Sequence, residues 1–232
     1  MSVLIRAIIF NLLLASAVFC QDTYVGRYDA YAGFGYLDSP HIDLSERGFH
    51  MQIGIRLKTW YSAGFDYSVT EGHTSLTPNL LTNAVQQQLG STFTQLAAAG
   101  QIPPGYALTV PIDSVTHTFA AGPQFAYRRW RAVTLYVRPS IGAIHEIATP
   151  KFTDPIESLV VTSLAPSGKK EDWTGFYGVG GGADLNFSRH VSIRVQIDVV
   201  HDHLFSDLLK DGRNTVRLSV GPAFQFGHNI AK

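Results

Sequence analysis

Arginines and aspartates recur on the polar face of several alternating segments of the chain, and the two signs balance there. The eight positions are Asp29, Arg56, Asp66, Arg138, Asp184, Arg194, Asp198 and Arg217. Ionised groups held in a narrow interior must be paired, because an unpaired one bears a large desolvation cost. The set therefore predicts a network of salt bridges that fills an interior. A gated or narrow ion pathway lined by the same groups remains the alternative.

His201 and His203 are the best candidates for metal binding or catalysis. At positions i and i+2 of a strand they share one face, but a metal site needs further ligands that this spacing does not supply. Two histidines at a membrane interface are the simpler interpretation. The chain contains no Walker loop, HExxH or GxSxG motif. We therefore expect neither an enzyme nor a cofactor, with a lipid A-modifying enzyme as the alternative.

Composition narrows the choice of partner. The 232 residues include 18 Lys+Arg and 18 Asp+Glu, so the formal net charge is zero and nucleic acid is not an expected partner. Charged residues at 16% lie below the roughly 25% that is usual for a soluble domain. The 21 glycines and the aromatic content of 12% favour β-structure. No break in composition divides the chain into two domains.

The first twenty residues resemble a secretory signal peptide. Arg6 precedes an apolar run, and small residues follow it. The run is shorter than the roughly 20 residues of a membrane-spanning helix. Cleavage after Ala17 and cleavage after Cys20 both fit the pattern, and the bulky Phe19 argues against lipidation of that cysteine. We expect residues 1–20 to be the signal peptide and residues 21–232 to be one domain.

The rest of the chain contains eight segments in which apolar and polar residues alternate with the period of a β-strand. Each is about as long as a tilted membrane strand, roughly 9 to 11 residues or slightly more. The segments are 27–37, 48–58, 61–71, 114–127, 132–146, 175–187, 191–204 and 214–226.

The connections between these segments alternate between short and long. Short turns are expected near 59–60, 128–131 and 188–190, and longer connections at 38–47, 72–113, 147–174 and 205–213. Bacterial membrane barrels have short periplasmic turns and long extracellular loops, with both chain ends on the periplasmic side. The pattern predicts an all-β fold, an eight-stranded antiparallel up-and-down transmembrane β-barrel.

The polar face of the segments identifies the side that lies inside. A soluble lipocalin-like barrel would have an apolar interior and a solvated exterior rich in Lys, Glu and Thr. Here the polar face is instead rich in glycine and serine, and small residues suit a narrow lumen. The apolar face is almost free of charge, which suits contact with lipid, where Arg or Lys at the midplane costs about 2 to 4 kcal/mol.

Three prolines fall on the predicted lipid face: Pro123, Pro139 and Pro222. A proline lacks the N–H that a strand donates to its neighbour, and a closed barrel has no free edge where this loss is tolerated. Gly122-Pro123 recurs as Gly221-Pro222 in the last segment. We therefore expect β-bulges at these positions.

Several stretches together carry a family resemblance: YDAYAGFGYL at 28–37, GFHMQIGIRLKTWYSAGFDYS at 48–68, and the closing strand at 214–226. They resemble the small eight-stranded outer-membrane barrels related to the transmembrane domain of OmpA. The resemblance implies an anchor, adhesin or small pore in the bacterial outer membrane, in contact with its lipids and lipopolysaccharide. It also implies that Phe224 and Phe226 form the C-terminal signal for the barrel-assembly machinery.

The connection 72–113 is too long for a simple loop. Apolar residues recur there at near-helical spacing, which predicts an amphipathic helix over 79–99 that ends before Pro103. This helix could cap the barrel or bind an extracellular ligand or protein. In the connection 147–174, Lys169 and Lys170 could contact lipopolysaccharide phosphates. We therefore expect an integral outer-membrane protein with a structural, envelope-integrity or loop-mediated binding role.

Overall fold

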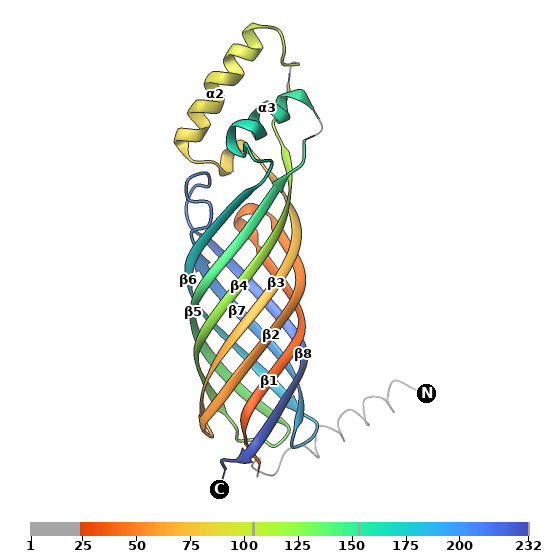
Figure 1. The fold of residues 1–232 in the computed structure, drawn as a ribbon, viewed down its shortest axis with the longest axis vertical. Helices are drawn as coiled ribbons and strands as arrows, with labels where there is room; N and C mark the ends of the chain where they lie inside the picture. Colours follow the sequence, from red (N-terminus) through yellow and green to blue (C-terminus); the bar gives the residue numbers. More distant parts are fainter. Residues whose placement is uncertain (1–23, 104, 153, 232) are drawn as a thin grey trace, which may run out of the picture.

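The computed structural model describes residues 24–103, 105–152 and 154–231, and the expected signal peptide lies outside the described residues. All eight predicted strands are present, and they form one closed antiparallel barrel in which β8 pairs with β1 (Figure 1). The strands are β1 Gly26–Ser39, β2 Leu44–Lys58, β3 Tyr61–Leu76, β4 Val110–Tyr127, β5 Val133–Pro150, β6 Lys170–Asn186, β7 Val191–Asp202 and β8 Arg213–Asn229. Consecutive strands are neighbours throughout, which is the predicted up-and-down topology.

The two ends of the barrel differ, as the alternating connections predicted. Short turns join β2 to β3, β4 to β5 and β6 to β7 at the end that we call the turn end. The longer connections gather at the opposite end, the loop end. Most strands extend further toward the loop end than predicted, so that β3 runs to Leu76 and β4 begins at Val110. The connection between β3 and β4 is correspondingly shorter than the predicted 72–113.

Two α-helices of the described residues lie beyond the loop end of the barrel (Figure 1). Helix α2, Asn83–Ala98, lies within the predicted range 79–99 and follows a short 3-10 turn, Pro78–Leu80. Helix α3, Pro155–Leu164, was not predicted. Its start carries recognisable signals, because Asp154 caps it by accepting a hydrogen bond from the Glu157 backbone N–H and proline occupies the first turn. A second 3-10 turn, Pro40–Ile42, joins β1 to β2.

Among the described residues, no helix has the length and apolar character needed to cross a membrane.

The barrel wall is apolar on its outside and polar on its inside. In β2, Phe49, Ile53 and Leu57 are exposed, whereas His50 and Gln52 are buried. The same alternation holds around the wall, where exposed apolar side chains include Phe34, Phe65, Val137, Ile141, Val179, Ile197, Leu218 and Phe224. This arrangement is the reverse of a lipocalin-like barrel, so the soluble alternative does not describe this fold.

The prediction of bulges at the three prolines is wrong. Pairing between β4 and β5 keeps one register from Ala121↔Ile141 to Phe125↔Val137, which places Pro123 opposite Pro139. Two missing donors therefore share one interruption of the ladder, and no extra residue is needed to accommodate either of them.

Pro222 is accommodated in the same way. The register between β1 and β8 is unchanged from Tyr31↔Ala223 to Phe34↔Val220, and the pairs between these two are absent. Pro222 thus lies opposite Ala32 in another interruption of the ladder without a bulge. The register shifts of the described strands lie elsewhere, between Gly26 and Tyr28 and between Arg56 and Lys58.

Candidate functional site

The eight arginines and aspartates that the sequence singled out all lie in the barrel interior. Each is at most 4% exposed. The eight residues come from seven of the eight strands, namely β1, β2, β3, β5, β6, β7 and β8. The alternation of each strand directs these side chains inward, and the closed barrel brings them together. Their contacts form two groups along the lumen, one around Arg194 and one around Asp66.

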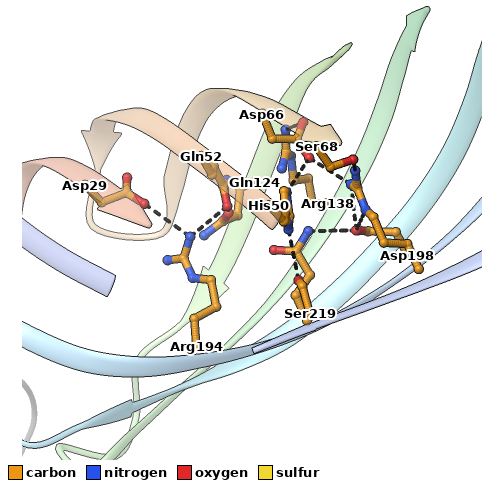
Figure 2. Close-up of polar contacts among 12 residues, drawn as sticks. Asp29, His50, Gln52, Asp66, Ser68, Gln124, Arg138, Arg194, Asp198 and Ser219 are labelled. Carbon is orange, nitrogen blue, oxygen red and sulfur yellow. Dashed lines mark hydrogen bonds and ion pairs between the residues drawn. The ribbon is translucent and has the colours of Figure 1, made fainter. Parts of the chain in front are cut away.

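Arg194 of β7 is the centre of the group nearer the turn end. Its guanidinium forms two hydrogen bonds with Asp184 of β6, from Nε to Oδ1 at 2.7 Å and from Nη2 to Oδ2 at 2.9 Å. Its Nη1 donates to Gln52 at 2.8 Å and lies 3.4 Å from Asp29 Oδ2 (Figure 2). One arginine therefore connects the two sides of the lumen. A paired carboxylate and guanidinium in this geometry is among the stronger polar contacts in proteins.

Aromatic rings complete the surroundings of Arg194. The guanidinium carbon lies 5.1 Å from the centroid of Tyr136 and 5.7 Å from that of Tyr31. The positive charge therefore has ring faces as well as carboxylates around it, an arrangement that favours arginine over lysine.

Arg56 occupies the same end of the lumen with less direct pairing. Its Nη1 donates to Gly26 O at 3.0 Å and to Gln225 Oε1 at 2.9 Å, and its Nε lies 4.0 Å from Asp29 Oδ1. The space bounded by Asp29, Arg56 and Arg194 is too small to hold a water molecule. The side chains therefore fill the lumen at this level.

Asp66 of β3 is the centre of the second group. Its two carboxylate oxygens contact Arg138 Nη2 and Arg217 Nη2, each at 2.8 Å. His50 Nε2 lies 3.0 Å from Asp66 Oδ2, and its other ring nitrogen lies 3.0 Å from Ser219 Oγ (Figure 2). Asp66 is thus held by side chains from β2, β5 and β8, three strands that reach it from different sides.

Asp198 extends this group to the far wall. Arg217 donates to Asp198 Oδ2 from Nε at 3.1 Å and from Nη2 at 2.8 Å, and Gln196 Nε2 donates to both oxygens of the same carboxylate. Tyr136 donates to Gln196 at 2.8 Å, and Tyr136 also faces Arg194. The two groups are therefore connected through side chains, and the network continues from one group to the other.

A third group of charges lies closer to the loop end, and it was not predicted from the sequence. Arg213 contacts Glu146 at 2.7 Å and Asp202 at 3.0 Å. Glu46 accepts hydrogen bonds from Thr70, Ser114 and Thr116 at 2.7, 2.6 and 2.9 Å, respectively. Glu46 and Arg213 lie outside the predicted strand ranges, so the inward alternation was not extended to them.

The two candidate metal-binding histidines lie next to each other at the loop end of β7. The ring centroids of His201 and His203 are 4.9 Å apart, and His201 Nδ1 lies 2.9 Å from Asn214 Oδ1. Within the part of the chain that the structure describes, no cluster of three or more His, Cys, Asp or Glu side chains is placed to hold a metal ion.

The residues predicted to be recognised by the assembly machinery or to contact lipopolysaccharide lie on the outer surface. Phe224 and Phe226 project outward from β8, and Phe226 stacks with Tyr28 at 5.7 Å between centroids. Their role in barrel assembly stays a prediction. Lys169 and Lys170, expected to meet lipopolysaccharide phosphates, form ion pairs with Glu171 and Asp207 respectively.

The helices at the loop end pack on each other rather than lying free. Val85 and Leu89 of α2 share an apolar cluster with Val160 and Val161 of α3. Tyr106, in the segment that leads back to β4, donates to Asp154 Oδ2 at 2.8 Å. This hydrogen bond ties the β3–β4 connection to the start of α3. We refer to residues 77–109 and 151–169 together as the head.

The pKa values of the two members of this contact are shifted in opposite directions. Partial burial and the Asp154 carboxylate raise the pKa of Tyr106 to about 12. The pKa of Asp154 is lowered, chiefly by the hydrogen bond from the Glu157 backbone N–H. At neutral pH the phenol is therefore protonated and the carboxylate is ionised, which is the combination that the hydrogen bond requires.

No protein-family model matches the sequence, and no curated protein matches it significantly. Solved structures are similar in fold. Neisserial surface protein A is 10% identical, with 86% of this chain and 96% of that chain covered and a TM-score of 0.50. OprG from Pseudomonas aeruginosa is 9% identical, with 88% and 98% covered and a TM-score of 0.47. Ail from Yersinia pestis is 11% identical, with 87% and 99% covered and a TM-score of 0.45.

At 10% identity and a TM-score of 0.50, the similarity to Neisserial surface protein A establishes the fold alone. That fold is the small eight-stranded outer-membrane β-barrel, which confirms the resemblance noted in the sequence.

Proposed function

We propose that the protein, which has the fold of the small outer-membrane barrels, is an integral outer-membrane anchor with a closed lumen. In this proposal the loop end is extracellular, and the head carries the binding function. The observation that carries the proposal is the contrast between an interior filled by paired charges and an exterior that is apolar around the whole wall.

The apolar exterior supports a position in the membrane. Ile53, Ile141 and Val179 are 63%, 69% and 54% exposed, which no solvated surface of this extent would tolerate. Trp60, Tyr127 and Trp130 are exposed beside the short turns, where the aromatic girdle of a membrane barrel is expected. The outer membrane is the membrane in which barrels with short periplasmic turns and long outer loops reside.

The paired interior supports a closed barrel rather than a pore. An ion that passed Asp66 would have to separate it from Arg138 and Arg217, both in contact at 2.8 Å. Separation would leave buried charges without partners, at a cost of about 3 to 5 kcal/mol for a broken buried pair. The narrow pore that the sequence left open is therefore the second candidate, and it requires the network to rearrange.

Conductance in planar bilayers tests the closed lumen. The wild-type protein should conduct almost nothing, and Arg138→Glu, which places a carboxylate beside Asp66, should not create an ion-selective step. Arg47→Glu is the matched control, since Arg47 is exposed near the loop end and lies outside the network. Heat-modifiable gel mobility verifies that each variant is folded. Discrete wild-type channels whose ion selectivity changes in Arg138→Glu would establish the pore instead.

Replacement of residues 77–109, the larger part of the head, tests the binding role. A variant in which residues 77–109 are replaced by a short Gly-Ser turn retains all eight strands of the barrel. It should reach the outer membrane and show the heat shift, yet fail to replace the wild-type protein in a strain that lacks it. If this variant fully replaces the wild-type protein in that strain, the protein acts through its barrel and the proposed binding role of the head is wrong.

A further inference from the structure

A cavity of about 80 Å³ lies at the loop end, where α3 covers the mouth of the barrel. We infer that this cavity binds a neutral small molecule that consists largely of hydrocarbon. The inference rests on the proposed function, because it assigns a ligand class to the loop end.

All four long connections contribute to the wall of the cavity. Ile42 comes from the connection between β1 and β2, Leu80 from the one before α2, Val161 from α3, and Leu208 from the connection between β7 and β8. Val110 and Ala148, near the loop ends of β4 and β5, also line the cavity. A site built from four separate segments is enclosed on several sides, as binding cavities for small molecules are.

The cavity borders both of the apolar clusters at the loop end. Val160 and Val161 belong to the cluster that includes α2 and α3, whereas Phe205 belongs to the cluster at the mouth of the barrel. Leu208 packs against both clusters. The aliphatic side chains at this junction lack contact partners on the side of the cavity. A hydrocarbon chain placed there would supply the missing dispersion contacts.

The charged residues of the wall favour a neutral ligand. Glu146 and Lys170 line the cavity, but each already has a partner of opposite charge. Glu146 lies 2.7 Å from Arg213 Nη2, and Lys170 pairs with Asp207. A charged ligand would lose its hydration and find no uncompensated opposite charge in return. A neutral molecule, such as an aliphatic alcohol, loses much less.

The stretch of chain that contributes Leu76 and Leu80 to the cavity wall is also without charge. Residues 74–112 contain no Asp, Glu, Lys, Arg or His, although this stretch includes the whole of α2 and Leu76 and Leu80 of the wall. It therefore offers no electrostatic attraction to an ionic ligand. The paired charges of the cavity wall and the absence of charge in this stretch therefore favour the same ligand class.

Methyl NMR of the whole protein in lipid nanodiscs tests the inference, with 1-hexanol and hexanoate as probes of equal chain length. We expect 1-hexanol to shift the methyl resonances of Val161 and Leu208 in a saturable manner. Hexanoate should bind at least 10-fold more weakly. Methyl groups of Ile53, on the lipid-facing side of β2, report alcohol that merely dissolves in the bilayer, and their response should be linear rather than saturable.

Filling the cavity should remove the binding. Ala165→Phe places a ring in the wall at the end of α3 and should weaken 1-hexanol binding at least 10-fold, whereas Ala97→Phe, on the exposed side of α2, should not change it. Ala148→Leu fills the cavity from β5 and gives a second measurement if Ala165→Phe displaces α3. The heat-modifiable gel shift confirms that the barrel of each variant is intact.

Unchanged 1-hexanol binding in both filling variants would overturn the inference, and so would hexanoate binding as tight as that of the alcohol. A linear response of Val161 that matches that of Ile53 would also overturn it, because it would show partition into lipid only. None of these outcomes alters the result of the Gly-Ser replacement of residues 77–109. The ligand class and the proposed binding role can therefore fail separately.

Discussion

Arg217 of β8 contacts Asp66 of β3 across the lumen, with 2.8 Å between Nη2 and Oδ2, although β1 and β2 separate the two strands in the wall. The same carboxylate contacts Arg138 of β5. A contact of this kind stabilises the barrel beyond the ladder of neighbouring strands, because it joins walls that share no backbone hydrogen bonds. It also makes Asp66 the residue on which most charges in the middle of the lumen depend.

Asp66→Asn should therefore destabilise the barrel strongly. Loss of the carboxylate leaves Arg138 and Arg217 buried without their shared partner, and we expect the free energy of unfolding to fall by about 3 to 5 kcal/mol. Urea titration in lipid vesicles, followed by the heat-modifiable gel shift, measures the change. Asp113→Asn is the control, since its ion pair with Lys151 lies at the surface and should contribute about 0 to 1 kcal/mol. Equal losses in the two variants would contradict the central role of Asp66.

Arg194→Lys should be destabilising although the charge is retained. Lysine cannot form the paired hydrogen bonds to Asp184 and still reach Gln52, and it lacks the flat group that faces Tyr31 and Tyr136. We expect a loss of about 1 to 3 kcal/mol in the same urea titration. Arg47→Lys, at an exposed position, should have no measurable effect. A silent Arg194→Lys variant would show that only the charge matters.

The sequence was sufficient to predict the strands of the barrel wall, but not the contacts between side chains in the lumen. Alternation places Asp66 and Arg217 on the inner face, yet their meeting depends on how far the strands are staggered around the closed barrel. The two residues are 151 positions apart in the chain. Stagger follows from the register of all eight pairs together, and no local pattern contains it. For this reason the balance of charges could be predicted, and the pairing of Asp66 with both Arg138 and Arg217 could not.

Two errors of the prediction from sequence, the omission of Glu46 and Arg213 and the expected bulges, have more specific physical reasons. Glu46 and Arg213 were missed because polar residues at the loop end interrupt the outer alternation, so the predicted strands stopped too early. The bulges were expected because each proline was considered alone, whereas Pro123 and Pro139 face each other across one gap. Helix α3 was detectable in principle, since Asp154, Pro155 and Glu157 form a recognisable helix start.

Gly122 should be intolerant of a side chain at the point where the two prolines meet. A Cβ at this position would lie 2.1 Å from the backbone oxygen of Pro139, which cannot move without displacing β5. Gly122→Ala should therefore lower the free energy of unfolding of the barrel by about 1 to 3 kcal/mol. Urea titration with the gel shift again measures the effect.

Gly90→Ala should act in the opposite sense. Gly90 lies within α2, and a Cβ there would meet nothing within 4 Å. Alanine should stabilise the helix by about 1 kcal/mol, because it removes the entropic cost of glycine in a helix. Slower amide hydrogen exchange in α2, with an unchanged urea midpoint for the barrel, is the expected result. Faster exchange would show that α2 needs the flexibility of glycine at this position.

The hydrogen bond from Tyr106 to Asp154 should make packing of the head depend on pH at both extremes. The pKa of Tyr106 is raised to about 12, so its contribution is complete below the ordinary tyrosine pKa of about 10 and is lost as the pH rises through 12. The pKa of Asp154 is lowered, so its contribution is complete above the ordinary aspartate pKa of about 4 and is lost in more acidic solution. The difference in absorbance at the phenolate band between wild type and Tyr106→Phe should titrate with a midpoint near 12. Asp154→Asn removes the carboxylate charge that opposes ionisation of the phenol, so it should move this midpoint toward 10. A midpoint that stays unchanged in Asp154→Asn would contradict the contact between Tyr106 and Asp154.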